Sequence, residues 1–170
     1  MHKLADGFVL GKLNLQNKEA LAQMFAKASD YAQLESGISD PKKESLAVLT
    51  DLPSGKSQED KEVLGVFNPQ GELVGVVDLV RDFPQKSEWM LGLLELIPEA
   101  RGKGLGKIIH AALVKKVLAG SGKSLRIGVL QVNLAALNFW KSLGYEKIGH
   151  TQQTFGEKVQ EIEILRLNLK

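Results

Sequence analysis

Apolar residues follow two different periods along the chain, and each period predicts one type of element. Alternating or continuous apolar runs predict strands over 8–15, 63–67, 73–80, 89–97, 125–132, 145–155 and 159–169. Apolar residues spaced three and four positions apart predict helices that begin at Asn17, Leu105 and Asn133. Between Ser29 and Lys61 the pattern predicts one further short helix, over either 31–36 or 43–49.

This order of elements predicts an α/β (α+β) fold. The strands at 63–67, 73–80 and 89–97 are separated by turns rich in Asn, Asp, Pro and Gly, so we expect them to pair as an antiparallel meander. The later strands alternate with helices, which favours a mixed sheet with helices on its faces. The expectation is a single domain over residues 1–170, with a mostly antiparallel sheet of about seven strands flanked by about four helices.

Composition and charge argue against several classes of function. Hydrophobic residues make up 44% of the chain and charged residues 25%, which is ordinary for a folded globular domain. A net charge of +2 provides no general attraction to nucleic acid or to an anionic membrane, so neither is expected as a partner. The chain has no cysteine and its three histidines are far apart in sequence, so no metal site is expected. No signal-like or membrane-spanning apolar run occurs, so we expect a cytoplasmic location.

The segment Leu94–Lys107 carries the clearest chemical signal, because a strand runs through a glycine-rich turn into an amphipathic helix. Glycines let backbone N–H groups approach a ligand closely, and a helix N-terminus adds positive potential. Arg101, Lys103 and Lys107 add positive charge. The sequence therefore predicts an anion site, for which pyrophosphate is the natural occupant.

Other ligands of glycine-rich loops fit this pattern less well. The spacing of Gly102, Gly104 and Gly106 differs from the Gly-x-Gly-x-x-Gly pattern of dinucleotide sites. The segment Gly122–Ser124 ends like a P-loop, but it lacks the first glycine and precedes a strand, so we interpret it as a turn. An RNA-binding surface on the basic run 101–107 would need interleaved aromatic residues, and the run has none.

Two motifs together resemble the GNAT acyltransferase superfamily. Arg101, Gly104 and Gly106 match the Arg/Gln-x-x-Gly-x-Gly/Ala pattern of its motif A, and the segment Asn133–Tyr145 resembles its motif B. The second motif lies one helix and one strand after the first, as the family arrangement requires. The resemblance is clear from about residue 63 to 145, and the order of elements fits it over the whole chain. The segment 29–61 provides no support for it.

The resemblance implies acetyl-CoA as co-substrate and no metal. It places the cofactor where the strand ending at Ile97 and the parallel strand 125–132 part. Backbone groups of the first strand would pair with the pantetheine arm, backbone N–H groups of the turn would hold the pyrophosphate, and Asn133 would lie near the reactive end while also capping a helix. The cofactor-binding residues implied are Leu94, Glu95, Leu96, Arg101, Gly102, Lys103, Gly104, Leu105, Gly106, Lys107, Asn133 and Phe139.

The usual catalytic groups of the family are missing from this chain. Where many members have a tyrosine acid in motif B, this chain has Trp140, whose indole N–H is no practical acid. Where some members have a glutamate base on the preceding strand, it has Gly128. Glu95 is the remaining ionisable group close to the thioester, and it is our candidate base because burial in an apolar strand would raise its pKa.

Two other roles for Glu95 stay open: it binds a cationic amine in the acceptor cleft, or it points to solvent. Glu88 and Tyr145 are secondary catalytic candidates, while we expect His110 to be packed or exposed and not catalytic. Positioning and backbone hydrogen bonds to the thioester carbonyl would also be chemically adequate without a dedicated acid.

The hypothesis is an acetyl-CoA-dependent N-acetyltransferase that acetylates a primary amine by direct attack in a ternary complex. The acceptor is unidentified, either a small molecule or a protein amine, and the resemblance implies that the early helices and the segment Arg81–Glu88 shape its site. A noncatalytic acyl-CoA-binding regulatory module on the same fold is the alternative, and a homodimer is compatible with either.

Overall fold

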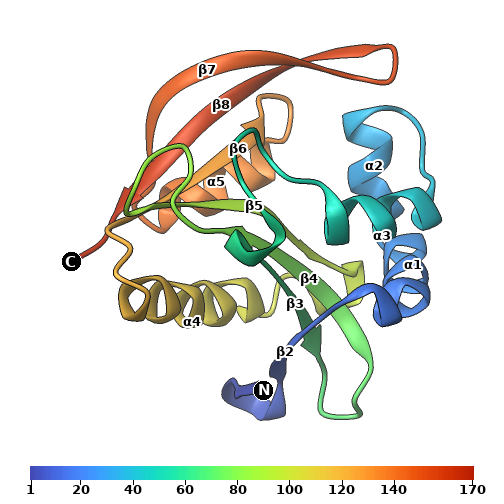
Figure 1. Ribbon diagram of the computed structural model, residues 1–170. Helices are drawn as coiled ribbons and strands as arrows, with labels where there is room; N and C mark the ends of the chain where they lie inside the picture. The colour runs from blue at the N-terminus through green and yellow to red at the C-terminus, as the bar shows by residue number, and fades with distance from the viewer.

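A computed structural model describes all residues 1–170, and its strands form one mixed sheet (Figure 1). The strands are β1 (His2–Lys3), β2 (Val9–Lys12), β3 (Lys61–Phe67), β4 (Leu73–Val80), β5 (Glu88–Leu96), β6 (Ser124–Leu130), β7 (Glu146–Phe155) and β8 (Lys158–Asn168). Their order across the sheet is β1-β2-β3-β4-β5-β6-β8-β7. All neighbouring strands are antiparallel except the parallel pair of β5 and β6. The predicted fold class and meander are confirmed, with β1 as an additional short edge strand.

The helices are α1 (Lys18–Lys27), α2 (Ser29–Glu35), α3 (Pro41–Thr50), α4 (Leu105–Ala119) and α5 (Leu134–Ser142). The segment for which one short helix was predicted therefore contains both α2 and α3. Asp40 begins α3 by accepting a hydrogen bond from the Lys43 N–H, and Pro41 occupies the first helical position. No helix is both long and apolar enough to cross a membrane.

A single apolar cluster fills both sides of the sheet. Val76 and Val77 are neighbours on β4 and both are fully buried. Because adjacent strand residues point to opposite faces, the centre of the sheet is covered on both sides. The helices α1 and α3 pack against each other, and α1 also contacts β4. The middle strands are therefore a rigid support for whatever β5 and β6 present at their ends.

The parallel strands β5 and β6 pair over only three residues. Glu88–Met90 of β5 lies beside Ser124–Arg126 of β6, and no further pairs follow although both strands continue. β5 stays paired with β4 as far as Leu96, and β6 stays paired with β8 as far as Leu130. The two strands therefore diverge after Met90 and leave a gap within the sheet.

A bulge in β5 lies where the gap begins. Leu79 pairs with Leu91 and Asp78 pairs with Leu93, so Gly92 is an extra residue on β5. A Cβ at Gly92 would lie 2.9 Å from Oδ2 of Asp78, so a side chain would not fit without a shift. The Asp78 carboxylate is held by the buried Lys61 ammonium at 2.7 Å. Glycine at this position lets the bulge pack directly against that ion pair.

The hairpin of β7 and β8 arches toward α2 at the top of Figure 1. Gln160 is 4% exposed and donates hydrogen bonds to the carbonyl oxygens of Leu34 and Glu35, at 2.9 and 3.0 Å. Lys158 donates to the Leu34 carbonyl at 3.0 Å. These bonds satisfy carbonyls at the C-terminal end of α2, which a helix otherwise leaves unpaired. The C-terminal hairpin and the early helices are thus tied together on one side of the molecule.

The segment Gly122–Ser124 connects α4 to β6, whose first residue is Ser124, and no helix follows it. A Cβ at Gly122 would lie 2.3 Å from Cγ1 of Val117 and 2.9 Å from the Trp89 ring. This glycine therefore allows α4 to end against the first residues of β5. Its role is packing, which agrees with the rejection of a P-loop.

Candidate active site

The parted strands β5 and β6 border a narrow cleft of about 90 Å³. Its walls are Gly92–Glu95 of β5 and Ile127–Leu130 of β6, and Asn133 and Trp140 line it from the cap and the body of α5. Tyr31 of α2 lines the same cleft. The gap predicted between these two strands is therefore present.

Backbone groups of β5 face this gap. The Ile97 N–H donates to the Val74 carbonyl on β4 at 2.9 Å. Because successive residues of a strand direct their backbone groups to opposite edges, those of Glu95 also face β4, whereas those of Leu94 and Leu96 face the gap. Of the three residues predicted to pair with pantetheine, only Leu94 and Leu96 can therefore offer their backbone, and the prediction for the Glu95 backbone is wrong.

The turn before α4 presents a row of unpaired N–H groups. The Arg101 N–H donates to the Pro98 carbonyl, and the next backbone bond is from the Ile108 N–H to the Gly104 carbonyl. None of the six N–H groups of Gly102–Lys107 donates to a backbone or side-chain acceptor of the protein. A row of N–H groups at a helix N-terminus is the geometry that binds anions.

The three glycines of this turn do two different things. Gly102 and Gly104 adopt left-handed backbone angles, with φ of 73° and 82°, and a Cβ on either would meet nothing within 4 Å. They give the turn its shape and leave open space above its N–H groups. Gly106 instead lies against the Phe139 ring, which would be 3.1 Å from an added Cβ. The implied cofactor residue Phe139 thus packs against the first turn of α4.

Arg101 directs its side chain away from the row of N–H groups. Its guanidinium forms a two-bond ion pair with Asp30 of α2, and its Nε donates to the Leu96 carbonyl at 2.8 Å. The hydrogen bonds from Arg101 lower the pKa of Asp30 below its ordinary value. The side chain therefore joins α2 to the end of β5. The positive charge of Arg101, which we expected at the anion site, is paired with the carboxylate of Asp30.

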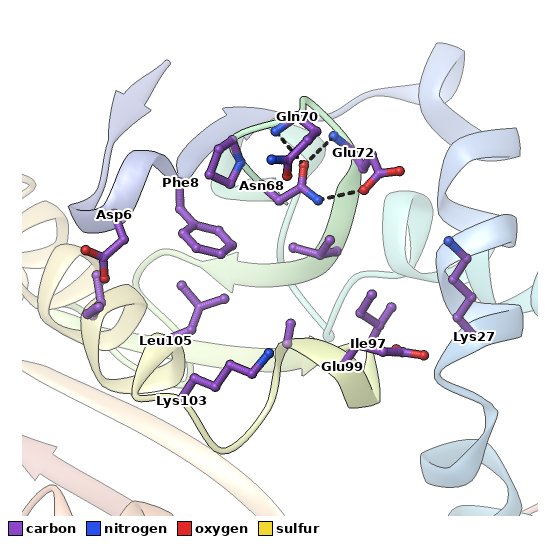
Figure 2. Close-up of a pocket in the computed structure, with 14 residues that line it drawn as sticks. Asp6, Phe8, Lys27, Asn68, Gln70, Glu72, Ile97, Glu99, Lys103 and Leu105 are labelled. Atoms are coloured by element: carbon purple, nitrogen blue, oxygen red, sulfur yellow. Dashed lines mark hydrogen bonds between the residues drawn. The ribbon is translucent and has the colours of Figure 1, made fainter.

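A second cavity, of about 640 Å³, lies beside the same turn but does not contain the candidate catalytic groups. Figure 2 shows Phe8 and Leu105 on its apolar wall, and the Lys103 side chain extending into it. Neither Glu95 nor Asn133 lines this cavity. Lys103 was expected to add charge near the pyrophosphate, but its side chain faces this second space.

Glu95 is the buried carboxyl of the cleft. The residue is 6% exposed, and its Oε1 has no hydrogen-bond partner. Burial raises the pKa of Glu95 to about 8, the Glu44 carboxyl acts in the same direction, and the Arg101 guanidinium acts against both. The reading in which Glu95 points to solvent is therefore wrong, whereas its roles as a base and as an amine-binding group both fit its position.

One residue that lines the cleft, Tyr31, was not identified from the sequence. Glu35 lies beside the Tyr31 hydroxyl, and the Glu44 carboxyl helps to raise the pKa of Glu95, but neither of these two residues lines the cleft. Tyr31 and Glu35 are four positions apart, so on one helix they share a face. That spacing was the available signal, but nothing in the sequence placed this helix at the cleft.

The residues that replace the usual acid and base do line the cleft. Trp140 and Gly128 both contribute to its wall. A Cβ at Gly128 would lie 3.1 Å from the Ile162 side chain, so even a small side chain there would be tight. The Asn133 side chain accepts a hydrogen bond from the Ala136 N–H at 3.1 Å, which confirms its predicted role as a helix cap.

The secondary catalytic candidates lie outside the cleft. Glu88 is buried between Arg126 and Arg166, at 3.7 and 3.9 Å. His110 shares a buried hydrogen bond of 3.1 Å with the Tyr145 hydroxyl, and burial lowers the pKa of His110. These groups connect neighbouring elements and do not line the cleft.

The segment Arg81–Glu88 was expected to shape the acceptor site, and it contributes no residue to the cleft. It precedes the short paired part of β5, whereas the cleft begins after that part, at Gly92. The early helices do reach the cleft, through Tyr31. Of the two regions expected to shape the acceptor site, the early helices therefore border the cleft and this segment does not.

Comparisons with known proteins agree on one family and one fold. Residues 25–145 match the family described as "Acetyltransferase (GNAT) family". An acetyltransferase from Thermus thermophilus superposes with a TM-score of 0.77 at 18% identity, over 99% of this chain and 100% of that chain. The ribosomal-protein alanine N-acetyltransferase from Escherichia coli has a TM-score of 0.72 at 14% identity, over 95% and 94%. An N-acetyltransferase from Staphylococcus aureus has a TM-score of 0.71 at 14% identity, over 96% and 99%.

We expect Glu95→Gln to change how stability depends on pH. In the unfolded chain Glu95 ionises near its ordinary pKa of 4.5, whereas in the folded protein it keeps its proton until about pH 8. The folded wild type therefore loses stability as pH rises through this window, by up to roughly 1.4 kcal/mol per pH unit from this group, and loses no more above it. Glutamine cannot ionise, so the free energy of unfolding of the variant should increase relative to that of wild type as pH rises through this window.

Urea unfolding at a series of pH values measures this difference. Glu59→Gln is the matched control, because Glu59 is exposed and the substitution removes the same charge. Parallel stability profiles for wild type and Glu95→Gln would show that Glu95 ionises normally in the folded protein, contrary to its burial.

Proposed function

Because the chain belongs to the GNAT family of acetyltransferases, we propose that it transfers the acetyl group of acetyl-CoA to a primary amine by direct attack in a ternary complex. The observation that carries the proposal is the gap between β5 and β6, which runs toward the row of free N–H groups at Gly102–Lys107. A ligand would fit both features if it had an extended arm that forms strand-like hydrogen bonds in the gap and an anionic group that binds the row of N–H groups.

The residues present fit acetyl-CoA. The free N–H groups of Gly102–Lys107 would hold the pyrophosphate, in the open space above Gly102 and Gly104. The backbone groups of Leu94 and the Leu96 N–H, which face the gap, would hold the pantetheine amides, whereas the Leu96 carbonyl already accepts a hydrogen bond from Arg101. When bound, acetyl-CoA supplies the acetyl group as an activated thioester.

Glu95 would receive the proton that the amine must lose. An alkylammonium with a pKa near 10.4 is about 3.4 units from neutrality at pH 7, which costs roughly 4.6 kcal/mol. A carboxylate of ordinary pKa is a poor acceptor for that proton, since the two pKa values differ by about 6 units. The pKa of about 8 for Glu95 narrows this mismatch to roughly 2.4 units. Burial thus makes this carboxylate a better base.

No side chain of the cleft is suited to act as the acid. Trp140 stands where the family resemblance implies a tyrosine, and the Tyr145 hydroxyl is bound to His110 away from the cleft. Burial also raises the pKa of Tyr31, which makes that hydroxyl a weaker acid. The rate enhancement would then rest on Glu95, on positioning, and on backbone N–H groups of β5 that face the thioester carbonyl.

We expect Gly104→Leu to lower the affinity for CoA by about a hundredfold or more, because the side chain would occupy the space assigned to pyrophosphate and several charge-assisted hydrogen bonds would be lost. Gly55→Leu is the matched control. Gly55 has nearly the same backbone angle, 81° against 82°, and equally open surroundings, so both variants bear similar strain. Calorimetric titration with CoA compares the two. Unchanged affinity in a folded Gly104→Leu protein would refute the proposed pyrophosphate site.

We expect Glu95→Gln to lower kcat by roughly a hundredfold while leaving the affinity for acetyl-CoA near that of wild type. The pH profile identifies the cause, because wild-type kcat/KM should rise with pH around pH 8, whereas the variant should keep only the later rise due to the amine itself. Thiol release measures both parameters, with Glu59→Gln as control. Equal turnover with an unchanged pH profile would remove Glu95 from the mechanism, and binding without release on any amine would support the noncatalytic alternative.

A further inference from the structure

The second cavity, which is the larger of the two, is formed by four segments that are far apart in sequence. The N-terminal segment with Phe8, the end of α1, the turn between β3 and β4, and the turn between β5 and α4 all line it (Figure 2). Two of these segments pack against each other, since a Cβ at Gly7 would lie 3.2 Å from Cγ of Pro69. Three hydrogen bonds of 2.7 to 3.0 Å within Asn68–Glu72 fix the shape of the β3–β4 turn. The cavity therefore has preformed walls.

The size and the apolar lining of this cavity suit a small organic ligand. Its volume of about 640 Å³ is within the range of roughly 300–1,000 Å³ that is usual for small-molecule pockets. Val74, Ile97 and Leu105 line it and are only 5%, 8% and 5% exposed. Phe8 and Ile108 also line it and are half-buried, so they keep apolar surface in contact with water. A ligand with an apolar body would remove that surface from water.

The charged side chains of the cavity have both signs. Lys27 and Lys103 provide ammonium groups, whereas Asp6, Glu72 and Glu99 provide carboxylates. None of these five side chains takes part in an ion pair of the protein. Figure 2 shows Glu72 at the upper side of the cavity and Lys103 at its lower side. A ligand with one charged group of each sign fits these walls better than a simple anion or cation, which would also meet groups of its own sign.

Two residues of the β5–α4 turn belong both to this cavity and to the candidate pyrophosphate site. The N–H groups of Lys103 and Leu105 are part of the unpaired row, and their side chains line the cavity. Gly102 and Gly104 flank Lys103, and a Cβ on either would meet nothing within 4 Å, so few contacts restrain the turn there. A ligand that contacts both side chains would restrict the turn, which would then lose less conformational freedom on binding CoA.

We propose that the second cavity binds a dipeptide with apolar side chains, and that this ligand strengthens the binding of CoA. The carboxylate of the dipeptide would lie at Lys103, its ammonium group at Glu72, and its side chains against Phe8 and Leu105. A dipeptide is favoured over a single amino acid because a peptide unit separates its charged ends, which suits charges on opposite sides of the cavity. The cavity shares no lining residue with the cleft between β5 and β6, so this ligand is an effector and not the acceptor.

Calorimetric titration of the full chain with leucyl-phenylalanine, in the absence of CoA, tests the site directly. The N-acetyl derivative and the C-terminal amide are the matched probes, because each lacks one charged end. Exposed ion pairs contribute little, so each derivative should bind roughly threefold more weakly than the free dipeptide. Free leucine and phenylalanine should bind more weakly still, because each fills less of the apolar lining.

Variants of the lining residues identify where the dipeptide binds. Phe8→Ala should weaken its binding by about tenfold, through the loss of apolar contact. Lys103→Met should abolish the preference for the free dipeptide over its amide. Lys107→Met is the matched control, because it removes the same charge from the same segment at a residue that does not line the cavity, and it should keep that preference.

The affinity for CoA, measured with and without saturating dipeptide, tests the coupling. The dipeptide should increase this affinity by roughly fivefold, and CoA should increase the affinity for the dipeptide by the same factor, because coupling between two sites is reciprocal. No binding of the dipeptide, or equal binding of the dipeptide and both derivatives, would overturn the proposed site. Binding that leaves the CoA affinity unchanged would overturn the coupling. If the dipeptide binds and CoA does not, the proposed pyrophosphate site fails while the cavity assignment stands.

Discussion

The hydrogen bonds that β5 and β6 do not make with each other determine where this protein can act. Two parallel strands that are each paired on their outer side stop pairing with each other after Met90. The backbone groups of Leu94 and the Leu96 N–H therefore face a gap, while the Leu96 carbonyl accepts from Arg101. Buried peptide groups without partners are costly, and most proteins avoid them. Here the bulge at Gly92, packed against the Asp78 and Lys61 ion pair, lies where the two strands part. A ligand that binds like a strand would satisfy the groups that the fold leaves unpaired.

The buried carboxyl of Glu95, at the same gap between β5 and β6, also lowers the stability of the fold. Burial of Glu95 among other carboxyls raises its pKa and opposes its ionisation, and this lowers the stability of the folded protein at neutral and higher pH. The same burial brings the pKa closer to that of an amine, which a base for this chemistry needs. The loss of stability and the greater basicity of Glu95 therefore have the same cause, the burial of its carboxyl.

The parts of the fold that depend on local signals could be predicted from the sequence. The alternation in β3, β4 and β5 with their polar turns gave the meander, and the glycines at 102 and 104 indicated a turn with free N–H groups. Contacts between distant residues could not be predicted. Arg101 pairs with Asp30, seventy-one positions away, and nothing in the local pattern of either residue indicates the other. Tyr31, Glu35 and Glu44 were missed for the same reason, because what they do depends on where α2 and α3 lie relative to the cleft.

Backbone amide exchange with and without acetyl-CoA tests the central claim most directly, since that claim concerns individual N–H groups. The account predicts that acetyl-CoA slows exchange at Leu94 and Leu96 and across Gly102–Lys107, while the turn at Asn68–Glu72 beside the larger cavity stays unchanged. Protection centred on Asn68–Glu72, with none across Gly102–Lys107, would place the ligand in the larger cavity and contradict the account.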